Sequence, residues 1–274
     1  MEDMPRGVEN RRALTGQLRE LWSRRDLLLA ITRRDIRVRY VQSVMGVLWA
    51  VLMPALVVIA GILVRVALAK IQDRPPQPME LVSVSVRSLP WAFLVSAIRF
   101  GTNSLLSNES LVAKIYFPKE VFPLAAMLSS LFDLAVAAAA LAIVLGLAGV
   151  SATVHILWVP PLLAVLVLFA TGLALLLSAA NLFYRDVKYL VEVALTFGIF
   201  FTPVFYETAL FGPWGRLILL NPAAVVLESL GTAVVSHRAP DPLWLSYAAF
   251  VSLVVCATGY RLFKRLEPRF AEVI

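Results

Sequence analysis

Residues 44–64 read VMGVLWAVLMPALVVIAGILV, an apolar stretch without a charged side chain. A helix needs about 20 apolar residues to cross the hydrocarbon core of a bilayer. Pro54 lies inside the stretch, and membrane helices tolerate a proline because neighbouring groups satisfy the freed carbonyl. The stretch therefore predicts a membrane-spanning helix and places the chain in the all-α integral membrane class.

The composition of the whole chain agrees with this class. Of the 274 residues, 60% are hydrophobic and 16% are charged, and the mean hydropathy is +0.81. A soluble domain of this size could not bury so much apolar surface, and disordered chains have low hydrophobicity. The composition thus argues against both classes, and the single cysteine, Cys256, cannot form an intramolecular disulfide.

Five further apolar segments predict five further crossings. They cover residues 89–106, 121–147, 156–183, 189–205 and 243–263. A polar, proline-rich stretch at residues 70–81 predicts an exposed loop after the first crossing. The expected fold therefore has six transmembrane helices.

Residues 208–236 contain two apolar halves, each too short to cross. Asn221 and Pro222 separate them, and a proline breaks a helix at that point. Two half-length helices joined by a break predict a re-entrant hairpin that enters and leaves by the same, outer face. The alternative is one kinked span, which would give seven crossings and place the termini on opposite sides.

The distribution of basic residues favours six crossings. With both termini cytoplasmic, 18 of the 25 Lys and Arg residues fall on the cytoplasmic side, as the positive-inside rule requires. Arg65 and Arg87 are assigned to the margins of outside loops. Anionic lipid, rather than nucleic acid, explains the net charge of +7. The chain then divides into a cytoplasmic amphipathic segment (1–43), a six-span domain (44–263) and a cytoplasmic tail (264–274).

The amino-terminal segment predicts helices at the membrane surface rather than a removable signal peptide. Leu14, Leu18, Leu21 and Trp22 share one helical stripe with arginines around it, the pattern of an amphipathic interface helix. A second short helix is expected from Asp26 toward Arg39, because Asp26 suits an N-cap position.

Several chemistries lack their residues in this sequence. There is no G-x-x-x-x-G-K-[ST] phosphate loop, no Cys/His cluster with metal spacing and no nucleophile elbow. His155 and His237 are isolated and fall in predicted outside loops. We therefore expect no enzyme, no metal site and no cofactor bound by this chain.

Two charged residues inside predicted spans require a reason, since each costs a few kcal/mol at the bilayer centre. Arg99 and Asp133 are expected at similar depth, within roughly 3 Å at 1.5 Å rise per residue. The sequence predicts that they form an ion pair between adjacent helices. That either one faces a polar conduit is an equally open alternative.

The connection at residues 107–124, between the second and third spans, predicts a short amphipathic cytoplasmic helix. Asn108 is expected to cap it, and Glu109 suits its first turn. Leu111, Ile115 and Tyr116 recur at helical spacing. This helix either docks onto a partner or lies as a plain connection on the lipid headgroups.

A group of aromatic residues follows the predicted fifth span. Its members are Phe197, Phe200, Phe201, Phe205 and Tyr206. Aromatic residues near an interface usually belong to the interfacial belt or to packing. Five within ten residues could also form a surface along which sugar rings slide.

Ordered blocks of the sequence resemble one family of membrane proteins. They are RRDIRVRYVQSVMGVLWAVLMPAL (33–56), SNESLVAKIYFPKEVFPLA (107–125), LFYRDVKYLVEVALTFGIFFTPVFY (182–206), LNPAAVVLESL (220–230) and FKRLEPRFAEV (263–273). They resemble the permeases of type-2 ABC polysaccharide exporters, which move O-antigen, teichoic acid and capsular chains. The resemblance covers nearly the whole chain.

The resemblance implies a particular assembly and location. Such permeases form homodimers in the bacterial cytoplasmic (inner) membrane, with a channel at the dimer interface for a lipid-linked glycan. Two separate ATPase subunits bind ATP and Mg²⁺, which would explain the missing phosphate loop. The alternatives are a type-2 ABC exporter of drugs or small lipids, a secondary transporter, or an intramembrane polyprenyl-glycan enzyme.

The resemblance also implies roles for individual residues. The coupling helix (108–118) that docks on the ATPase would include Asn108, Glu109, Leu111, Val112, Lys114, Ile115, Tyr116 and Phe117. The substrate channel and its gates would include Arg37, Arg39, Tyr40, Phe197, Phe200, Phe201, Phe205 and Tyr206. Arg185 and Asp186 would lie at the inner mouth. Two residues depart from the family pattern: Arg99 is unusual in the second span, and Gly231 stands where arginine is common.

Overall fold

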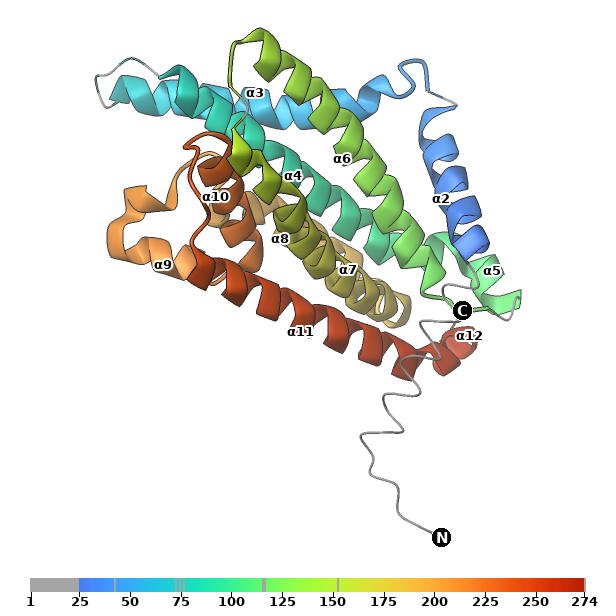
Figure 1. The fold of residues 1–274 in the computed structure, drawn as a ribbon. Coiled ribbons are helices and arrows are strands. Elements are labelled where there is room, and N and C mark those ends of the chain that lie inside the picture. The colour runs from blue at the N-terminus through green and yellow to red at the C-terminus, as the bar shows by residue number, and fades with distance from the viewer. Residues whose placement is uncertain are drawn as a thin grey trace.

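The computed structural model describes residues 25–41, 43–71, 73, 75, 77–114, 117–151 and 153–273. Within these ranges every regular element is helical and none is a strand (Figure 1). Five long helices form the body of the protein. They are α3 (Leu48–Ile71), α4 (Pro78–Asn103), α6 (Val121–Leu147), α7 (Val159–Phe183) and α11 (Pro242–Leu266).

Shorter helices connect and flank these five. The α-helices are α2 (Arg25–Tyr40), α5 (Glu109–Lys114), α8 (Val187–Gly198), α9 (Gly215–Ile218), α10 (Pro222–Val234) and α12 (Phe270–Val273). The 3-10 turns are η1 (Leu106–Asn108), η2 (Val154–Trp158), η3 (Ile199–Phe201), η4 (Thr208–Trp214) and η5 (Glu267–Arg269).

Helices α4 and α7 form the centre of the bundle. Helix α7 packs against α4, α6, α10 and α11, and α4 is the most buried of the five long helices. Small residues permit the close approach, as in other membrane helix pairs. A Cβ atom on Gly172 of α7 would lie 2.6 Å from backbone atoms of Cys256 on α11. The α7–α11 contact is therefore made backbone against backbone.

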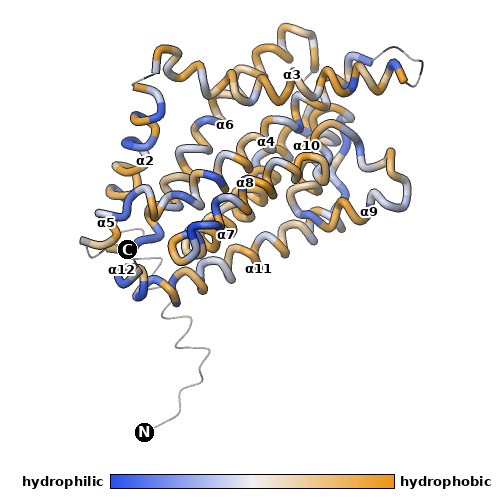
Figure 2. Tube along the Cα trace, turned by 180° about the vertical axis from the view of Figure 1, so that it is seen from behind, coloured by the Kyte–Doolittle hydropathy of each residue, from blue (hydrophilic) through white to orange (hydrophobic). Residues whose placement is uncertain are grey.

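The connections lie at two opposite ends of the bundle (Figure 1). Helices α2, α5 and α12 lie at one end, which we call the α5 end, and α2 crosses it at an angle to the long helices. The α3–α4 turn, α9 and the start of α11 lie at the other end, which we call the α9 end. Figure 2 shows hydrophilic residues gathered on α2 and near α12, whereas α3 is mostly hydrophobic.

The predicted spans agree with four long helices and differ at two. Segments 44–64, 121–147, 156–183 and 243–263 correspond to α3, α6, α7 and α11. Helix α4 begins at Pro78, eleven residues before its predicted start at Leu89, because Pro78 occupies the first turn and the helix continues through Pro90. The exposed loop predicted at 70–81 is correspondingly shorter.

The predicted fifth span, 189–205, is short in the structure. It corresponds to the 12-residue helix α8 followed by the turn η3. At 1.5 Å per residue, α8 is about 18 Å long, less than the roughly 30 Å hydrocarbon core. The part of the chain that the structure describes therefore contains five helices of spanning length, not six.

The region predicted as a hairpin is broken where the sequence predicts. Asn221 caps α10, and its side-chain oxygen accepts a hydrogen bond from the Ala223 N–H. The first half is not a single helix, however, because Gly212 has a positive φ of 52° inside η4. Of the amino-terminal helices, α2 corresponds to the one expected from Asp26, whereas the stripe at Leu14–Trp22 lies outside the described residues.

Candidate functional site

A cavity of about 530 Å³ opens between α3, α4, α6 and α8. Apolar side chains form most of its wall, among them Trp49, Met53 and Phe93. Three charged residues also line it, Arg39, Arg99 and Asp133, together with polar side chains that include Tyr40, Ser96, Ser130 and Thr196. The cavity therefore combines an apolar wall with charged groups, a combination that an ordinary lipid-facing surface lacks.

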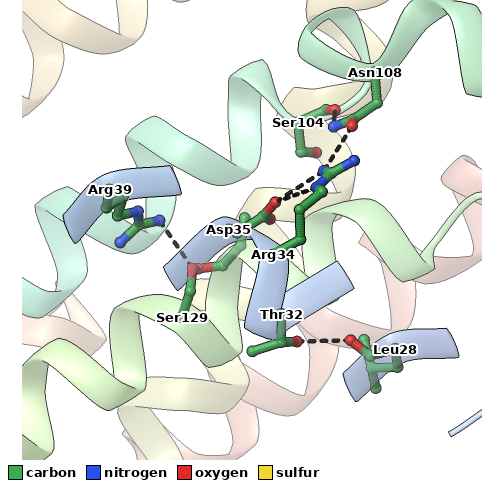
Figure 3. Close-up of polar contacts among 9 residues, drawn as sticks. Leu28, Thr32, Arg34, Asp35, Arg39, Ser104, Asn108 and Ser129 are labelled. Carbon is green, nitrogen blue, oxygen red and sulfur yellow. Dashed lines mark hydrogen bonds and ion pairs between the residues drawn. The ribbon is translucent and has the colours of Figure 1, made fainter. Parts of the chain in front are cut away.

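Asp133 of α6 holds the carboxyl end of α2. Its two oxygens accept hydrogen bonds from Arg39 Nη1 at 2.7 Å and from the Tyr40 hydroxyl at 2.6 Å. Arg39 also donates to Ser129 Oγ, as Figure 3 shows, and its guanidinium lies 3.7 Å from the centre of the Phe100 ring. These contacts anchor an amphipathic surface helix to the body of the bundle.

Tyr40 acts as a donor in this arrangement. Burial raises the pKa of its hydroxyl well above the usual range, and the hydrogen bond to Asp133 acts in the same direction. The hydroxyl therefore keeps its proton at physiological pH and donates a hydrogen bond to the carboxylate.

The predicted ion pair between Arg99 and Asp133 is wrong. Arg99 of α4 instead makes two hydrogen bonds of 2.7 Å to the carboxylate of Glu192 on α8. Depth along a helix axis does not show which way a side chain points around it, and α2 and α8 each supply a nearer partner. Both residues nevertheless line the same cavity.

The five aromatic residues after α8 divide into two groups. Phe197, Phe200 and Phe201 are exposed, each by more than half of its surface. Phe205 is half-buried against Gly61 of α3, and Tyr206 donates a hydrogen bond to the Phe200 carbonyl. Three of the five aromatic side chains are therefore exposed.

The predicted coupling helix is shorter than residues 108–118. Helix α5 has six residues and follows the turn η1. Glu109 is exposed, Leu111 is half-buried and Val112 is buried, while Phe117 packs edge-on against Phe122. Ile115, Tyr116 and the side chain of Lys114 lie outside what the structure describes.

Asn108 does not act as the predicted cap of this helix. Its amide oxygen accepts a hydrogen bond from Arg34 Nη2 of α2 at 2.7 Å, and its amide nitrogen donates to the Ser104 carbonyl (Figure 3). The sequence could not reveal this contact, because it depends on where α2 lies. Asn108 therefore links α2 to the segment before α5.

The remaining predicted residues lie on the surface of the α5 end. Arg37 is exposed on α2, and Arg185 and Asp186 are exposed in the turn between α7 and α8. Phe183, directly before this turn, packs against Phe270 of α12. The turn and α2 thus lie at the same end of the bundle, as the assignment of Arg185 and Asp186 to one mouth requires.

A charged cluster of two buried arginines and two partly exposed glutamates toward the α9 end was not identified from the sequence. It contains Arg65 of α3, Arg87 of α4, Glu207 and Glu228. Arg87 Nη1 donates to the Tyr206 carbonyl at 2.6 Å and lies 3.4 Å from Glu228, and Arg65 lies 3.6 Å from Glu207. Arg65 and Arg87 were assigned to loop margins, whereas both are buried within helices. Both arginines lie in apolar stretches of the sequence, and this pattern could have indicated that they are buried.

Gly231 explains how Arg87 fits into this cluster. A Cβ atom at residue 231 would lie 2.5 Å from Nε of Arg87. The Arg87 guanidinium thus occupies the space that a side chain on α10 would need.

The fold and the cavity together indicate the class of membrane protein to which the chain belongs. Several helices of spanning length, with charged residues facing an internal cavity, describe a multi-pass membrane protein of the transporter kind. The sequence pattern of the ABC-2 type transporter family matches residues 26–233. This range is more than half of the chain, and the chain belongs to the ABC-2 type transporter family. Members of this family are membrane subunits of transporters.

Similar proteins of known name extend the match to nearly the full length. The chain is 29% identical over 261 residues to the O-antigen export system permease protein RfbA of Myxococcus xanthus, covering 94% of this chain and 98% of that protein. Two proteins of the same name from Klebsiella pneumoniae are each 26% identical, with 91% of this chain and 95% of theirs covered. The resemblance to polysaccharide-export permeases is thereby confirmed.

Proposed function

We propose that this chain is the channel-forming permease subunit of an ATP-driven exporter that moves a lipid-linked polysaccharide across the bacterial cytoplasmic membrane. The observation that carries the proposal is similarity over more than 90% of the chain to permeases named for O-antigen export. These relatives are named for O-antigen export and not for export of drugs or small lipids, which favours a glycan as the cargo.

ATP and Mg²⁺ bind to a separate ATPase subunit in this proposal. The chain has no phosphate loop of its own. Helix α5 supplies the docking element, with Glu109, Ser110 and Ala113 exposed on one side and Val112 buried on the other. Two copies of the permease with two ATPase subunits complete the assembly.

The α5 end faces the cytoplasm in this proposal, and both termini lie there. The basic residues of α2, of the α7–α8 turn and of the end of α11 support this orientation. Helix α8 and η3 then form the sixth crossing. Their short length is tolerable if α8 faces the inside of the assembly, because backbone that lines protein or a water-filled cavity need not contact lipid.

Two copies of the chain meet through α3 and α8 in this proposal. Exposed large apolar side chains lie along both helices. They include Met53, Leu56, Ile59 and Leu63 on α3, and Tyr189, Leu190, Val193 and Phe197 on α8. The cavity between these helices would then open toward the seam between the subunits. The exposed phenylalanines would provide many weak contacts for a sliding sugar chain, as a processive conduit requires.

Helix α2 forms the inner gate in this proposal. Arg37 is exposed and can receive the diphosphate of the lipid carrier, whereas Asp133 holds Arg39 in the closed state. Movement of the ATPase reaches α2 through the Arg34–Asn108 hydrogen bond. Release of the Arg39–Asp133 pair would then open the cavity to the substrate.

The proposal is tested by removing the chain from a cell that makes a surface glycan. We expect the lipid-linked glycan to accumulate on the cytoplasmic side, and the tagged chain to co-purify with a phosphate-loop ATPase. Normal surface glycan in the deletion strain would contradict the proposal. Loss of drug resistance without a glycan defect would instead support the exporter of drugs or small lipids.

The docking element gives a sharper test. Ala113→Trp adds bulk to the exposed side of α5, so ATPase co-purification should fall at least tenfold without loss of folded permease. Ala209→Trp makes the same change on an exposed residue of η4 at the opposite end and should leave co-purification unchanged. Equal effects of the two variants would exclude α5 as the docking element.

A further inference from the structure

An ion pair with a buried carboxylate links the α5–α6 connection to the carboxyl end of α11. Glu120 directly precedes α6, and its side chain is 1% exposed. Lys264 Nζ of α11 donates to Glu120 Oε2 at 2.7 Å across 144 residues of sequence. Because a buried carboxylate without its partner is strongly unfavourable, this contact keeps the two segments together.

Glu267 closes the same contact from the other side. Its carboxylate accepts a hydrogen bond from Lys264 Nζ at 3.0 Å and another from the Lys119 N–H at 2.8 Å. The dipeptide Lys119–Glu120 is therefore bound both through its backbone and through a side chain. We call Glu120, Lys264 and Glu267 together the strut.

Aromatic packing makes the strut part of a rigid unit. Phe270 of α12 is fully buried, and its ring lies 5.2 Å from that of Phe263 on α11. Helix α12 in turn contacts α5. This segment also contacts α2, through the exposed Arg34–Asn108 hydrogen bond and through Ile31, which lies in the same buried cluster as Val112. A displacement of α5 is therefore transmitted to α11 as well as to α2.

Helix α11 carries a second contact near its opposite end. The Tyr247 hydroxyl donates a hydrogen bond of 2.9 Å to the carbonyl of Leu220. Leu220 lies directly before the Asn221–Pro222 break that begins α10, and α10 packs against α11. At 1.5 Å per residue, the 25 residues of α11 span about 38 Å. One continuous helix thus contacts the coupling segment at one end and the broken segment at the other.

We infer that α11 transmits the movement of α5 to the segment Leu210–Val235, with Glu120 and Lys264 as positioning residues at one end and Tyr247 at the other. The inference rests on the proposed function, since it requires an ATPase that moves α5. In this inference, α11 couples a movement of α5 at the α5 end to a movement of the segment 210–235 at the α9 end. The backbone contact at Gly172 holds α11 against the central helix α7.

The first experiment measures this response directly in the complex with its ATPase. Cys256 is replaced by alanine and Leu217, an exposed residue of α9, by cysteine. A membrane-impermeant maleimide then reports the exposure of residue 217 with and without ATP. We expect ATP to change the labelling rate at least threefold in this parent protein, and to change it by less than 1.5-fold after Lys264→Met or Tyr247→Phe. Arg265→Met, an exposed neighbour on α11, should respond like the parent.

The second experiment separates transmission from stability. We expect Lys264→Met and Tyr247→Phe complexes to hydrolyse ATP within twofold of wild type while glycan export falls at least fivefold. The charge exchange Glu120→Lys with Lys264→Glu should restore part of the export. A parallel loss of ATP hydrolysis and export, or normal export by the variants, would overturn the inference.

The outcomes remain distinct from those of the proposed function. If wild type neither binds an ATPase nor exports a glycan, the proposed function fails. If wild type does both and Tyr247→Phe exports normally with an unchanged ATP response at residue 217, only the inference fails. If the Lys264→Met permease does not assemble with its ATPase, the Tyr247→Phe variant alone tests the inference. It removes a single hydroxyl far from α5.

Discussion

Arg87 is buried in the helix bundle, and its guanidinium is only partly paired with hydrogen-bond acceptors. Among the described residues, Nε of Arg87, Nε of Arg65 and Oε2 of Glu228 are buried without a hydrogen-bond partner. Buried ion pairs are strongly disrupted when one member is removed, but often replaceable when both are. The cluster therefore links α3, α4 and α10. A rearrangement that gave the unpaired atoms hydrogen-bond partners would lower its free energy.

Replacement of Arg87 tests this balance. Arg87→Met should lower the stability of the detergent-solubilised protein by about 3 kcal/mol, because it leaves Glu228 as an uncompensated buried charge. Arg216→Met, at an exposed position of α9, should leave stability within about 0.5 kcal/mol. Thermal unfolding monitored by tryptophan fluorescence measures both. The double variant Arg87→Met, Glu228→Leu should recover most of the loss, and a double variant as unstable as the single one would contradict the pairing.

Partner choice among charged residues is the part of the site that sequence could not supply. Hydropathy identified Arg99 and Asp133 as intramembrane charges, and the structure places both on the cavity. Hydropathy could not show that Arg39 contacts Asp133 or that Glu192 contacts Arg99. Those contacts depend on the rotation of each helix about its axis and on where α2 docks. Arg87 was missed because α4 begins eleven residues before its predicted start, and Arg65 because α3 continues to Ile71, seven residues past its predicted end at Val64.

At the scale of elements, one carboxylate binds the last turn of α2 to the bundle. Asp133 receives both Arg39 and Tyr40 from the last turn of α2. Asp133→Asn removes the charge that strengthens these hydrogen bonds, which are worth about 1.5–3 kcal/mol each. Amide hydrogen exchange in residues 25–41 should then accelerate at least about tenfold.

A matched variant in the same cavity provides the control. Glu192→Gln weakens the contact between α4 and α8 but touches no residue of α2. It should leave exchange in residues 25–41 within twofold of wild type. Similar acceleration in both variants would show that the cavity, rather than the Asp133 contact, controls α2.

The α7–α11 contact depends on the absence of side chains. Gly172→Ala would place a Cβ 2.6 Å from the backbone of α11, so the two helices must separate. We expect a loss of about 1–3 kcal/mol, the usual result of overpacking. Gly146→Ala lies in α6 with nothing within 4 Å of the added Cβ, and should be neutral or stabilising by up to about 1 kcal/mol. Thermal unfolding of the two variants in the same detergent provides the measurement.

Elements that could be predicted from sequence are those whose signal is length and hydropathy. Helices α3, α6, α7 and α11 follow directly from long apolar runs. Helix α8 was assigned a full crossing because the aromatic residues after it continue the apolar run, although the chain leaves the helix at Ile199. The region 210–220 was expected to be one half-helix, and Gly212 interrupts it with a left-handed backbone conformation.

At the scale of the whole molecule, cysteine crosslinking tests whether the exposed surface of α8 is the proposed subunit interface or faces lipid. In a two-fold dimer the same patch occurs on both subunits, so residues near the axis can react with their own copies. Single cysteines at Tyr189, Val193 and Phe197, in a protein with Cys256→Ala, should give disulfide-linked dimers from at least one position. Leu253→Cys on the exposed side of α11 should give none under the same oxidation. Non-reducing electrophoresis distinguishes the results, and dimers from Leu253 alone would place the interface elsewhere.

The buried charges of α3 and α4 also have a consequence for how the protein is made. Tyr206, whose carbonyl binds Arg87, follows it by 119 residues in the chain. At about 5–20 residues per second, the ribosome needs roughly ten seconds to supply that partner. During this interval α3 and α4 carry arginines that disfavour release into lipid. We therefore expect the two helices to stay at the insertion machinery until the later segment, with Glu207 and Glu228, emerges and pairs with their arginines.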